Sequence, residues 1–258
     1  MVAVNNLLGT SSDDFLLGTV SKDHIFGFEG NDVLVAKDGH DLLRGGDGSD
    51  NIFGSFGWDF MLGGDGFDYM EGGAGNDTMY GDSYSEGNGI SLAEAANNAD
   101  TMYGGEGDDF MSGGEGDDVM LGQDDDDVML GGAGDDRVYG DGYGGGGGGA
   151  DGGNDLLDGG GGSDLLQGGA GDDTLIYRQF NNDTSSDMYR GGADDDLLQL
   201  YFTSEEVDRL GSNLTDDLDA FDNFLLATGG DGTFSFSSIG LQVENIEDYD
   251  VYVDGLLA

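Results

Sequence analysis

Apolar residues recur every nine positions along most of this chain, and each follows an aspartate by two residues. From Asp14 to Asp77 the aspartates stand nine residues apart without a slip. The spacing resumes at Asp100, Asp155 and Asp187 and gives eighteen units in all. A fixed period of this kind is typical of solenoid proteins, in which each repeat packs only on its neighbours.

Numbered from its first glycine, a unit reads Gly-Gly-x-Gly-x-Asp-x-U-x, where U is apolar, as in residues 72–80. The glycines and the aspartate predict a tight turn, and the last three positions predict a strand whose central side chain points into the core. The predicted core is therefore the position-eight set: Leu16, Ile25, Leu34, Leu43, Ile52, Met61, Met70, Met79, Met102, Met111, Met120, Met129, Val138, Leu157, Leu166, Leu175, Tyr189 and Leu198.

The repeats predict one elongated domain over residues 1–199. Three units in it are stretched at their turns, where a loop bulges into solvent without disturbing the strands. These insertions fall within residues 81–103, 140–158 and 177–190.

Residues 200–258 have a different pattern, which predicts a cap of one helix followed by strands. Apolar residues from Val207 to Leu225 recur at helical spacing, and Thr203 with Glu206 fits a capping box at the helix start. The alternating residues 233–237 and two later apolar stretches predict strands. Such a cap covers the open end that a solenoid otherwise exposes.

Charge adds a second constraint. The chain carries 55 acidic and 7 basic residues, a net charge of -48, together with 54 glycines. Self-repulsion at this charge opposes a compact state unless cations neutralise it, so we expect a chain that is disordered until a cation binds. Seven basic residues cannot neutralise many phosphates, which excludes nucleic acid as an expected partner.

Other classes are excluded by what the sequence lacks. It has no cysteine, so it has neither disulfides nor cysteine-based zinc sites. No apolar run approaches the length of a transmembrane segment. His24 and His40 lie in different turns, and no nucleophile elbow or nucleotide-binding loop is present, so we do not expect an enzyme.

Eight units match the whole motif and resemble the RTX (repeats-in-toxin, haemolysin-type) calcium-binding nonapeptide; they begin at Gly45, Gly63, Gly72, Gly104, Gly113, Gly131, Gly159 and Gly168. The resemblance implies an all-β fold, a right-handed parallel β-roll of about nine coils with two units to each coil. It also implies calcium between successive turns, with odd units forming one column of turns and even units the other. Carbonyl and carboxylate oxygens are the donors that calcium prefers.

The resemblance places the metal ligands at the first, third and sixth positions of the turns. We expect about eight to twelve Ca²⁺ ions, because Lys22 and Lys37 stand in the first turns of the even column and leave these weak or empty. The expected ligand residues are Gly27, Glu29, Asp32, Gly45, Asp47, Asp50, Gly63, Asp65, Asp68, Gly72, Ala74, Asp77, Gly104, Glu106, Asp109, Gly113, Glu115, Asp118, Asp127, Gly131, Ala133, Asp136, Asp155, Gly159, Gly161, Asp164, Gly168, Ala170, Asp173 and Asp196.

Positions seven and nine are expected to face outward from the sheets. In the first half they are largely apolar and form a candidate docking surface, with cover by the N-terminus or a self-contact as equal alternatives. The outward residues named by this pattern are Phe15, Leu17, Phe26, Val33, Val35, Phe53, Phe60 and Leu62 in the first half and Arg137, Asp158, Gln167 and Arg190 in the second.

The C-terminal residues resemble the uncleaved export signals of the same family, which end in an acidic residue followed by apolar ones; both Asp248-Tyr249-Asp250-Val251-Tyr252-Val253 and Asp254-Gly255-Leu256-Leu257-Ala258 fit. The first residues lack the charged start and apolar stretch of a cleaved signal peptide. We therefore expect a secreted protein that leaves through type I secretion machinery.

These observations favour a secreted, non-enzymatic calcium-binding protein that acts as an extracellular structural or adhesion module. Its expected partner is a cell-surface glycan or protein. One alternative is a repeat module related to secreted serralysin-like proteases, lipases or alginate epimerases, with catalysis elsewhere. Another is a cytolysin-related protein, although the long apolar helical region of such toxins is absent from the sequence.

Overall fold

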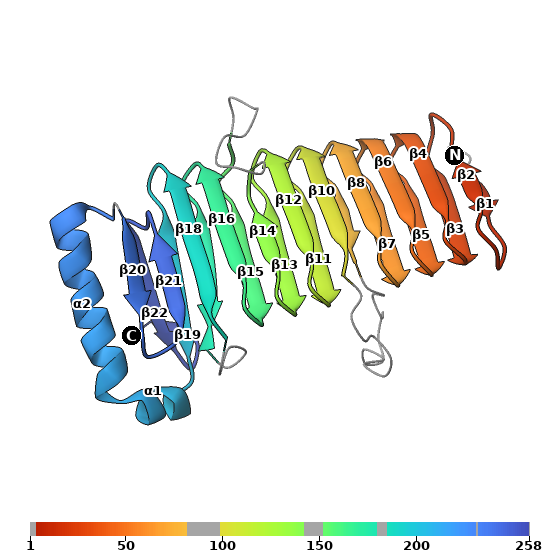
Figure 1. Cartoon of the computed structure of the whole chain (residues 1–258). Coiled ribbons are helices and arrows are strands. Elements are labelled where there is room, and N and C mark those ends of the chain that lie inside the picture. The colour runs from red at the N-terminus through yellow and green to blue at the C-terminus, as the bar shows by residue number, and fades with distance from the viewer. Residues whose placement is uncertain (1–3, 82–98, 142–151, 180–184, 231, 258) are drawn as a thin grey trace.

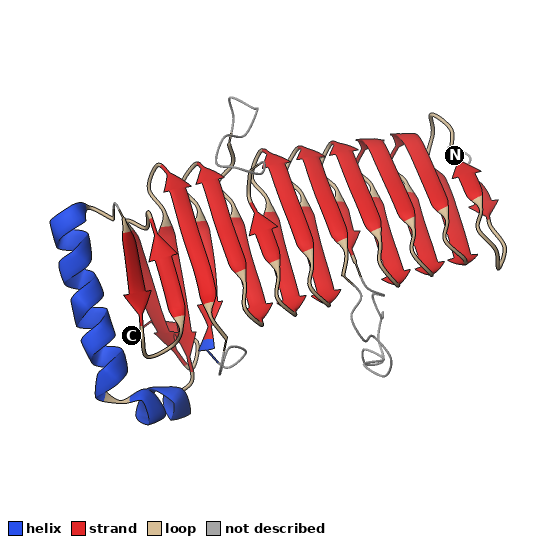
Figure 2. Cartoon of the chain, in the orientation of Figure 1, coloured by secondary structure: helices blue, strands red, loops and turns tan. Residues whose placement is uncertain are grey.

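The computed structural model of the chain describes residues 4–81, 99–141, 152–179, 185–230 and 232–257. Over these residues the chain winds into stacked coils whose strands form two sheets, with the main helices at the C-terminal end (Figure 1, Figure 2). The predicted parallel β-roll is confirmed. The residues inserted within 81–103, 140–158 and 177–190 lie largely outside the described part.

Successive strands alternate between the two sheets. The first sheet, here called sheet A, has the order β1 (Asn5–Leu8), β3 (Asp23–Glu29), β5 (Leu42–Asp47), β7 (Phe60–Asp65), β9 (Thr78–Tyr80), β11 (Phe110–Glu115), β13 (Val128–Ala133), β15 (Leu156–Gly161), β17 (Thr174–Arg178), β19 (Leu197–Phe202), β22 (Asp248–Val253) and β23 (Leu256–Leu257). The second, sheet B, has the order β2 (Phe15–Leu17), β4 (Val33–Gly39), β6 (Asn51–Gly57), β8 (Tyr69–Ala74), β10 (Thr101–Glu106), β12 (Val119–Asp124), β14 (Arg137–Tyr139), β16 (Leu165–Ala170), β18 (Asp187–Ala193), β21 (Leu241–Glu244) and β20 (Thr233–Phe236).

Stacked strands keep the register of the repeat. Leu43 on β5 pairs with Met61 on β7, two units further along the chain. Where an insertion intervenes, the register is restored on the far side, so that Met70 pairs with Met102 and Met129 with Leu157. The inserted residues therefore leave the strands undisturbed, as the sequence predicted.

The core consists of two rows of position-eight side chains between the sheets, one row from each sheet. All of them from Ile25 to Leu198 are fully buried, and Leu16 is partly buried because only one side of its strand is covered. The predicted core is confirmed, and the methionines belong to it.

Most strands of the repeats are longer than the three residues predicted for each unit. β7, for example, runs through Gly63 and Gly64 to Asp65. Gly64 has φ of +129° and still pairs with Gly46 on β5. Glycine tolerates this backbone conformation at little cost, so the ladder continues into the turn.

The cap contains two helices in place of the one that was predicted. α1 (Ser204–Leu210) begins with the predicted Thr203–Glu206 capping box, and α2 (Ser212–Thr228) follows after Gly211, whose backbone breaks the helix. Phe221 of α2 is fully buried against Phe234 and Phe236 of β20. Neither helix is long and apolar enough to cross a membrane.

The cap strands extend the sheets of the repeats. β21 adds to β18 and β22 adds to β19, both in parallel, before β20 and β23 close the sheets with antiparallel pairs. The predicted boundary after residue 199 falls inside β19.

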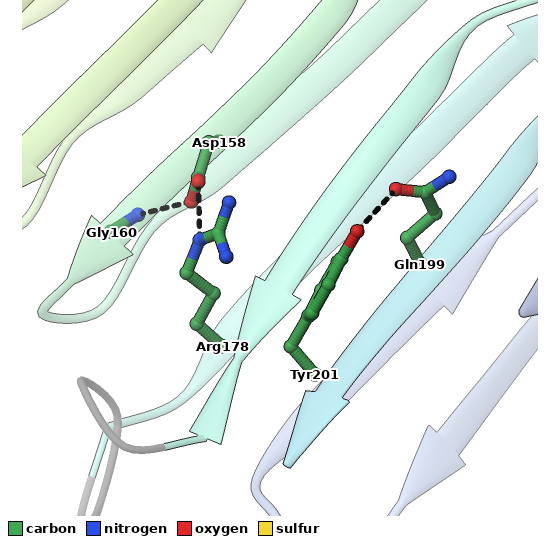
Figure 3. A network of polar contacts seen from close by, with 5 residues as sticks. All are labelled: Asp158, Gly160, Arg178, Gln199 and Tyr201. Atoms are coloured by element: carbon green, nitrogen blue, oxygen red, sulfur yellow. Dashed lines mark hydrogen bonds and ion pairs between the residues drawn. The ribbon is translucent and has the colours of Figure 1, made fainter. Parts of the chain in front are cut away.

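Outward-facing residues are arranged largely as predicted. The apolar set of the first half is partly or fully exposed at every position. Asp158 is only 7 % exposed, because its carboxylate accepts a hydrogen bond from Arg178 Nε at 2.6 Å (Figure 3). Tyr139 at position nine is also buried, which departs from the pattern.

Candidate metal centre

The position-six aspartates form two ladders between the coils, one along each column of turns. In each ladder Oδ1 of an aspartate accepts a hydrogen bond from the backbone N–H of the aspartate one coil earlier. Asp59 N–H donates to Asp77 Oδ1 at 2.7 Å, and Asp109 N–H donates to Asp127 Oδ1 at 2.8 Å. The bond recurs from Asp14 to Asp196, so one oxygen of each later aspartate is already used in joining coils.

The second oxygen of these carboxylates is buried and has no donor in much of the ladder. Within the described ranges, Oδ2 has no hydrogen-bond partner in Asp32, Asp41, Asp50, Asp59, Asp77, Asp109, Asp127, Asp136, Asp164, Asp173, Asp187 and Asp196. A buried carboxylate oxygen without a partner is costly. A cation between the coils removes that cost.

Backbone oxygens lie beside Oδ2 in most of these turns. A Cβ placed on Gly54 would lie 2.6 Å from Asp59 Oδ2 and 2.6 Å from the carbonyl oxygen of Gly72 in the next coil. Both oxygens therefore border one space, which only a glycine leaves open. The arrangement recurs in the odd column at Gly45, where Asp50 Oδ2 and the Gly63 carbonyl are the neighbours.

Positions two and four contribute carbonyls that the sequence reasoning did not include. A Cβ on Gly73 would collide with the Ser55 carbonyl, and one on Gly75 with the Gly57 carbonyl. These oxygens project from one turn toward the next. The glycines that recur at these positions indicate a close backbone approach in the sequence, but which carbonyls meet there shows only once the turns are stacked.

The predicted position-three residues also take part in the hydrogen bonds between coils. Their carbonyls accept hydrogen bonds from position-four N–H groups of the preceding coil, as Asp47 does from Gly30 at 2.9 Å and Asp65 from Gly48 at 2.7 Å. The side chains of Glu29, Asp47 and Asp65 are exposed. No three carboxylate or imidazole side chains converge on one point in the parts of the chain that the structure describes. An ion here would take most of its ligands from the backbone.

Burial raises the pKa of the ladder aspartates. It raises the pKa of Asp50 and Asp59 to about 6, of Asp77 to about 7 and of Asp109 to about 8, with repulsion between successive carboxylates adding to desolvation. In Asp127 burial raises the pKa to about 9. The backbone N–H bond lowers each value without offsetting burial. Only a bound cation or a proton offsets the free-energy cost of burying these charged carboxylates. The oxygen donors fit the hard cation calcium.

A comparison with known families agrees with this geometry. The model of the RTX calcium-binding nonapeptide repeat matches residues 8–43, 26–61, 35–70, 53–83, 94–129, 112–142 and 149–183, which together cover more than half of the chain. The chain belongs to the RTX calcium-binding nonapeptide repeat family. No curated protein matches it.

The first RTX turns differ from the later ones. Asp14 Oδ2 accepts a hydrogen bond from Thr10 N–H at 2.6 Å, and Asp23 Oδ2 accepts one from Thr19 N–H at 2.5 Å. Protein donors thus satisfy the oxygen that is unpartnered elsewhere. In the turn that contains Lys22 this adds a reason to the prediction of a weak site, whereas Asp41 Oδ2, in the turn that contains Lys37, has no such donor.

A further set of bonds joins the RTX turns through position five, which the motif leaves unspecified. The backbone N–H at this position donates to the side chain at position five one coil earlier, the reverse of the aspartate ladder. Ser49 donates to Asn31 Oδ1 at 2.8 Å, and Asp172 donates to Asn154 Oδ1 at 2.7 Å. The many Asp, Asn and Ser residues at position five were the signal for these bonds.

Proposed function

We propose that the chain is a secreted calcium-binding protein that folds when Ca²⁺ binds between successive turns, and that it acts outside the cell as a structural or adhesion module without catalytic activity of its own. The observation that carries this proposal is the buried Oδ2 atom left without a donor in coil after coil. Most of these atoms border a backbone carbonyl from the next coil, as Asp59 Oδ2 borders the Gly72 carbonyl.

The energetics support a chain that is switched by calcium. A site at which free calcium exceeds its dissociation constant tenfold contributes RT ln 11, about 1.4 kcal/mol, so ten sites contribute about 14 kcal/mol. The whole stability of a typical domain is about 5 to 15 kcal/mol. A chain of net charge -48 therefore remains unfolded where calcium is scarce and folds where calcium is plentiful.

The fold of the C-terminal residues supports export before folding. The segment that resembles an export signal forms β22 and β23, and Asp254 accepts a hydrogen bond from Ser204 N–H at 2.9 Å. In the folded roll this segment is part of sheet A. An export machine reads it as an extended peptide only while the chain is unfolded, in the low calcium of the cytosol.

Expression of the full chain with and without a type I exporter tests the export part of the proposal. We expect the chain in the medium only when the exporter is present, and less of it when cytosolic calcium is raised. Export without the exporter contradicts the proposed route. Hydrolase or epimerase activity of the purified, calcium-loaded chain contradicts the non-catalytic role.

A further inference from the structure

A hollow of about 340 Å³ lies on the outward face of sheet A near the N-terminal end. Phe26 and Phe28 of β3 line one side, with ring centroids 6.4 Å apart and planes 25° from parallel. Arg44 of β5 lies opposite, and the exposed side chains of Glu29 and Asp47 lie at the turn end. Small-molecule sites combine aromatic surface with a few convergent polar groups in this way.

Phe28 stands at position two of its unit, which is glycine in half of the units and is also held with positive φ by Lys37, Ser55 and Gln123. Its φ is +85°, a conformation that a bulky side chain rarely adopts, while the paired residue Gly46 has φ of +128°. Phe28 is 51 % exposed, so it gains little from burial in return for this strain. Strain of this kind is concentrated at functional sites.

Arg44 is available to a ligand. Its side chain is exposed and forms no ion pair within the described part of the chain. Arg178, further along the same face, is instead held by Asp158 and stacks on Tyr201 with 4.8 Å between the guanidinium carbon and the ring centroid (Figure 3). The guanidinium of Arg178 is thus held by contacts within the fold, whereas that of Arg44 forms no ion pair in the described residues.

A row of aromatic rings continues along sheet A from the hollow. Phe60 on β7, Tyr80 on β9 and Phe110 on β11 follow one another with centroids 5.8 and 5.7 Å apart. All three are partly exposed. They provide a row of aromatic rings, tilted by 47° and 52° from one ring to the next, that runs along the roll axis, across the strands.

Taken together, these features lead us to propose that the outward face of sheet A binds a neutral polysaccharide, with one sugar ring in the hollow formed by Phe26, Phe28 and Arg44 and the chain extending over Phe60, Tyr80 and Phe110. The apolar faces of sugar rings stack on aromatic side chains. The guanidinium of Arg44 donates hydrogen bonds to hydroxyl groups, and the carboxylates of Glu29 and Asp47 accept them. With eight to twelve bound Ca²⁺ ions the chain keeps a net charge of about -32 to -24, which repels anionic polymers and favours a neutral one.

This inference rests on the proposed function, since it names the ligand of a folded extracellular module. Affinity electrophoresis of the full chain in calcium tests it, with gels that contain a neutral polysaccharide (mixed-linkage β-glucan, galactomannan, xylan or soluble starch) or anionic polygalacturonate. We expect at least one neutral polymer to retard the chain and polygalacturonate to leave it unretarded. Retardation by polygalacturonate alone, or by none of the polymers, overturns the proposal.

Matched variants locate the site. Phe28→Gly removes the ring while relieving backbone strain, and Ser55→Gly relieves the same strain at φ of +87° on sheet B. Arg44→Gln is paired with Arg137→Gln, an exposed arginine of sheet B. We expect Phe28→Gly and Arg44→Gln to weaken retardation at least tenfold and both controls to retain it. Equal retardation of all four variants overturns the assignment.

Two further measurements keep this proposal separate from others. Circular dichroism in calcium shows whether each protein is folded: a folded chain that binds no polymer contradicts only the glycan site, whereas a chain that calcium does not fold contradicts the proposed function itself. Sedimentation tests whether a second copy covers the face. A dimer that Phe28→Gly dissociates, with no polymer bound, would replace the glycan by self-association.

Discussion

Glu247 occupies the place that an aspartate holds in every earlier coil: its Oε2 accepts a hydrogen bond from the backbone N–H of Asp196 at 3.0 Å. It precedes β22, in the segment that brings the chain back to sheet A. The even ladder of aspartates therefore ends on a carboxylate from the cap. The odd ladder ends on a backbone oxygen, because Asp187 N–H donates to Gly240 O at 3.1 Å.

Replacing Glu247 is expected to weaken the cap end of the roll. Glu247→Ala leaves the N–H of Asp196 without its acceptor and lowers the free energy of unfolding by about 1 to 3 kcal/mol. Glu247→Gln keeps an oxygen in place and costs less. Urea unfolding in saturating calcium measures both, with exposed Glu205→Ala as control. Equal stability of Glu247→Ala and wild type contradicts the role of this bond.

Asp109 is buried in the ladder and its neighbour Asp108 is exposed. Replacing each of them separates the effect of a ladder carboxylate from the effect of total charge. Asp109→Asn keeps the Oδ1 acceptor but removes a buried charge, whereas Asp108→Asn removes a charge from an exposed side chain. We expect Asp109→Asn to bind at least one ion fewer and to need less help from calcium in folding. Asp108→Asn is expected to match wild type. Calcium counted by equilibrium dialysis and by calorimetry checks the difference.

Protons are expected to substitute partly for calcium. Burial raises the folded-state pKa of Asp77 and Asp164 to about 7 and of Asp136 and Asp173 to about 8, from 3.8. Groups whose folded pKa is raised contribute stability that is fully present below the unfolded pKa and is lost as pH rises through the folded pKa. In chelator, the chain should therefore gain β structure as pH falls from 8 toward about 4.

The same protonation opposes calcium binding, so the calcium midpoint should rise as pH falls from 8 to about 6. Far-ultraviolet circular dichroism at a series of pH values measures both effects. A calcium midpoint that does not change with pH contradicts the assignment of the ladder aspartates as ligands.

Truncating one buried methionine of the core is expected to lower the free energy of unfolding substantially. Met111 is fully buried and packs between the sheets, so Met111→Ala should lower the free energy of unfolding in calcium by about 2 to 5 kcal/mol. Ser112→Ala, at the next and outward position, should change it little. If Met111→Ala lowers the free energy of unfolding by less than Ser112→Ala does, packing of the core does not govern stability.

The sequence predicted the roll, its core and its register because a strict period determines all three. Once the position-eight residues of the other units were assigned to the core, the same period also placed Met79 there. The bonds at position five and the acceptor role of Glu247 were missed, because the motif leaves position five open and Glu247 lies where the period has ended. The break at Gly211 was also missed, since the apolar spacing from Val207 to Leu225 continues across it.

The assignment of the position-three residues as ligands stays a prediction. The set includes Ala74, Ala133 and Ala170, so it rests on the position-three carbonyl, which in Asp47 accepts a hydrogen bond from Gly30 N–H. Whether the second lone pair of that carbonyl faces an ion depends on backbone geometry that the spacing does not specify. The carbonyls at positions two and four became visible only when successive turns were placed together.

A calcium titration tests whether the chain folds only when calcium is bound. Far-ultraviolet circular dichroism of the full chain is recorded at neutral pH, beginning in chelator and adding calcium to the millimolar range. The account predicts a coil spectrum that changes cooperatively to a β spectrum. A β spectrum already present in chelator, unchanged by calcium, would show that the apolar core outweighs the repulsion of the buried aspartates and would contradict the account.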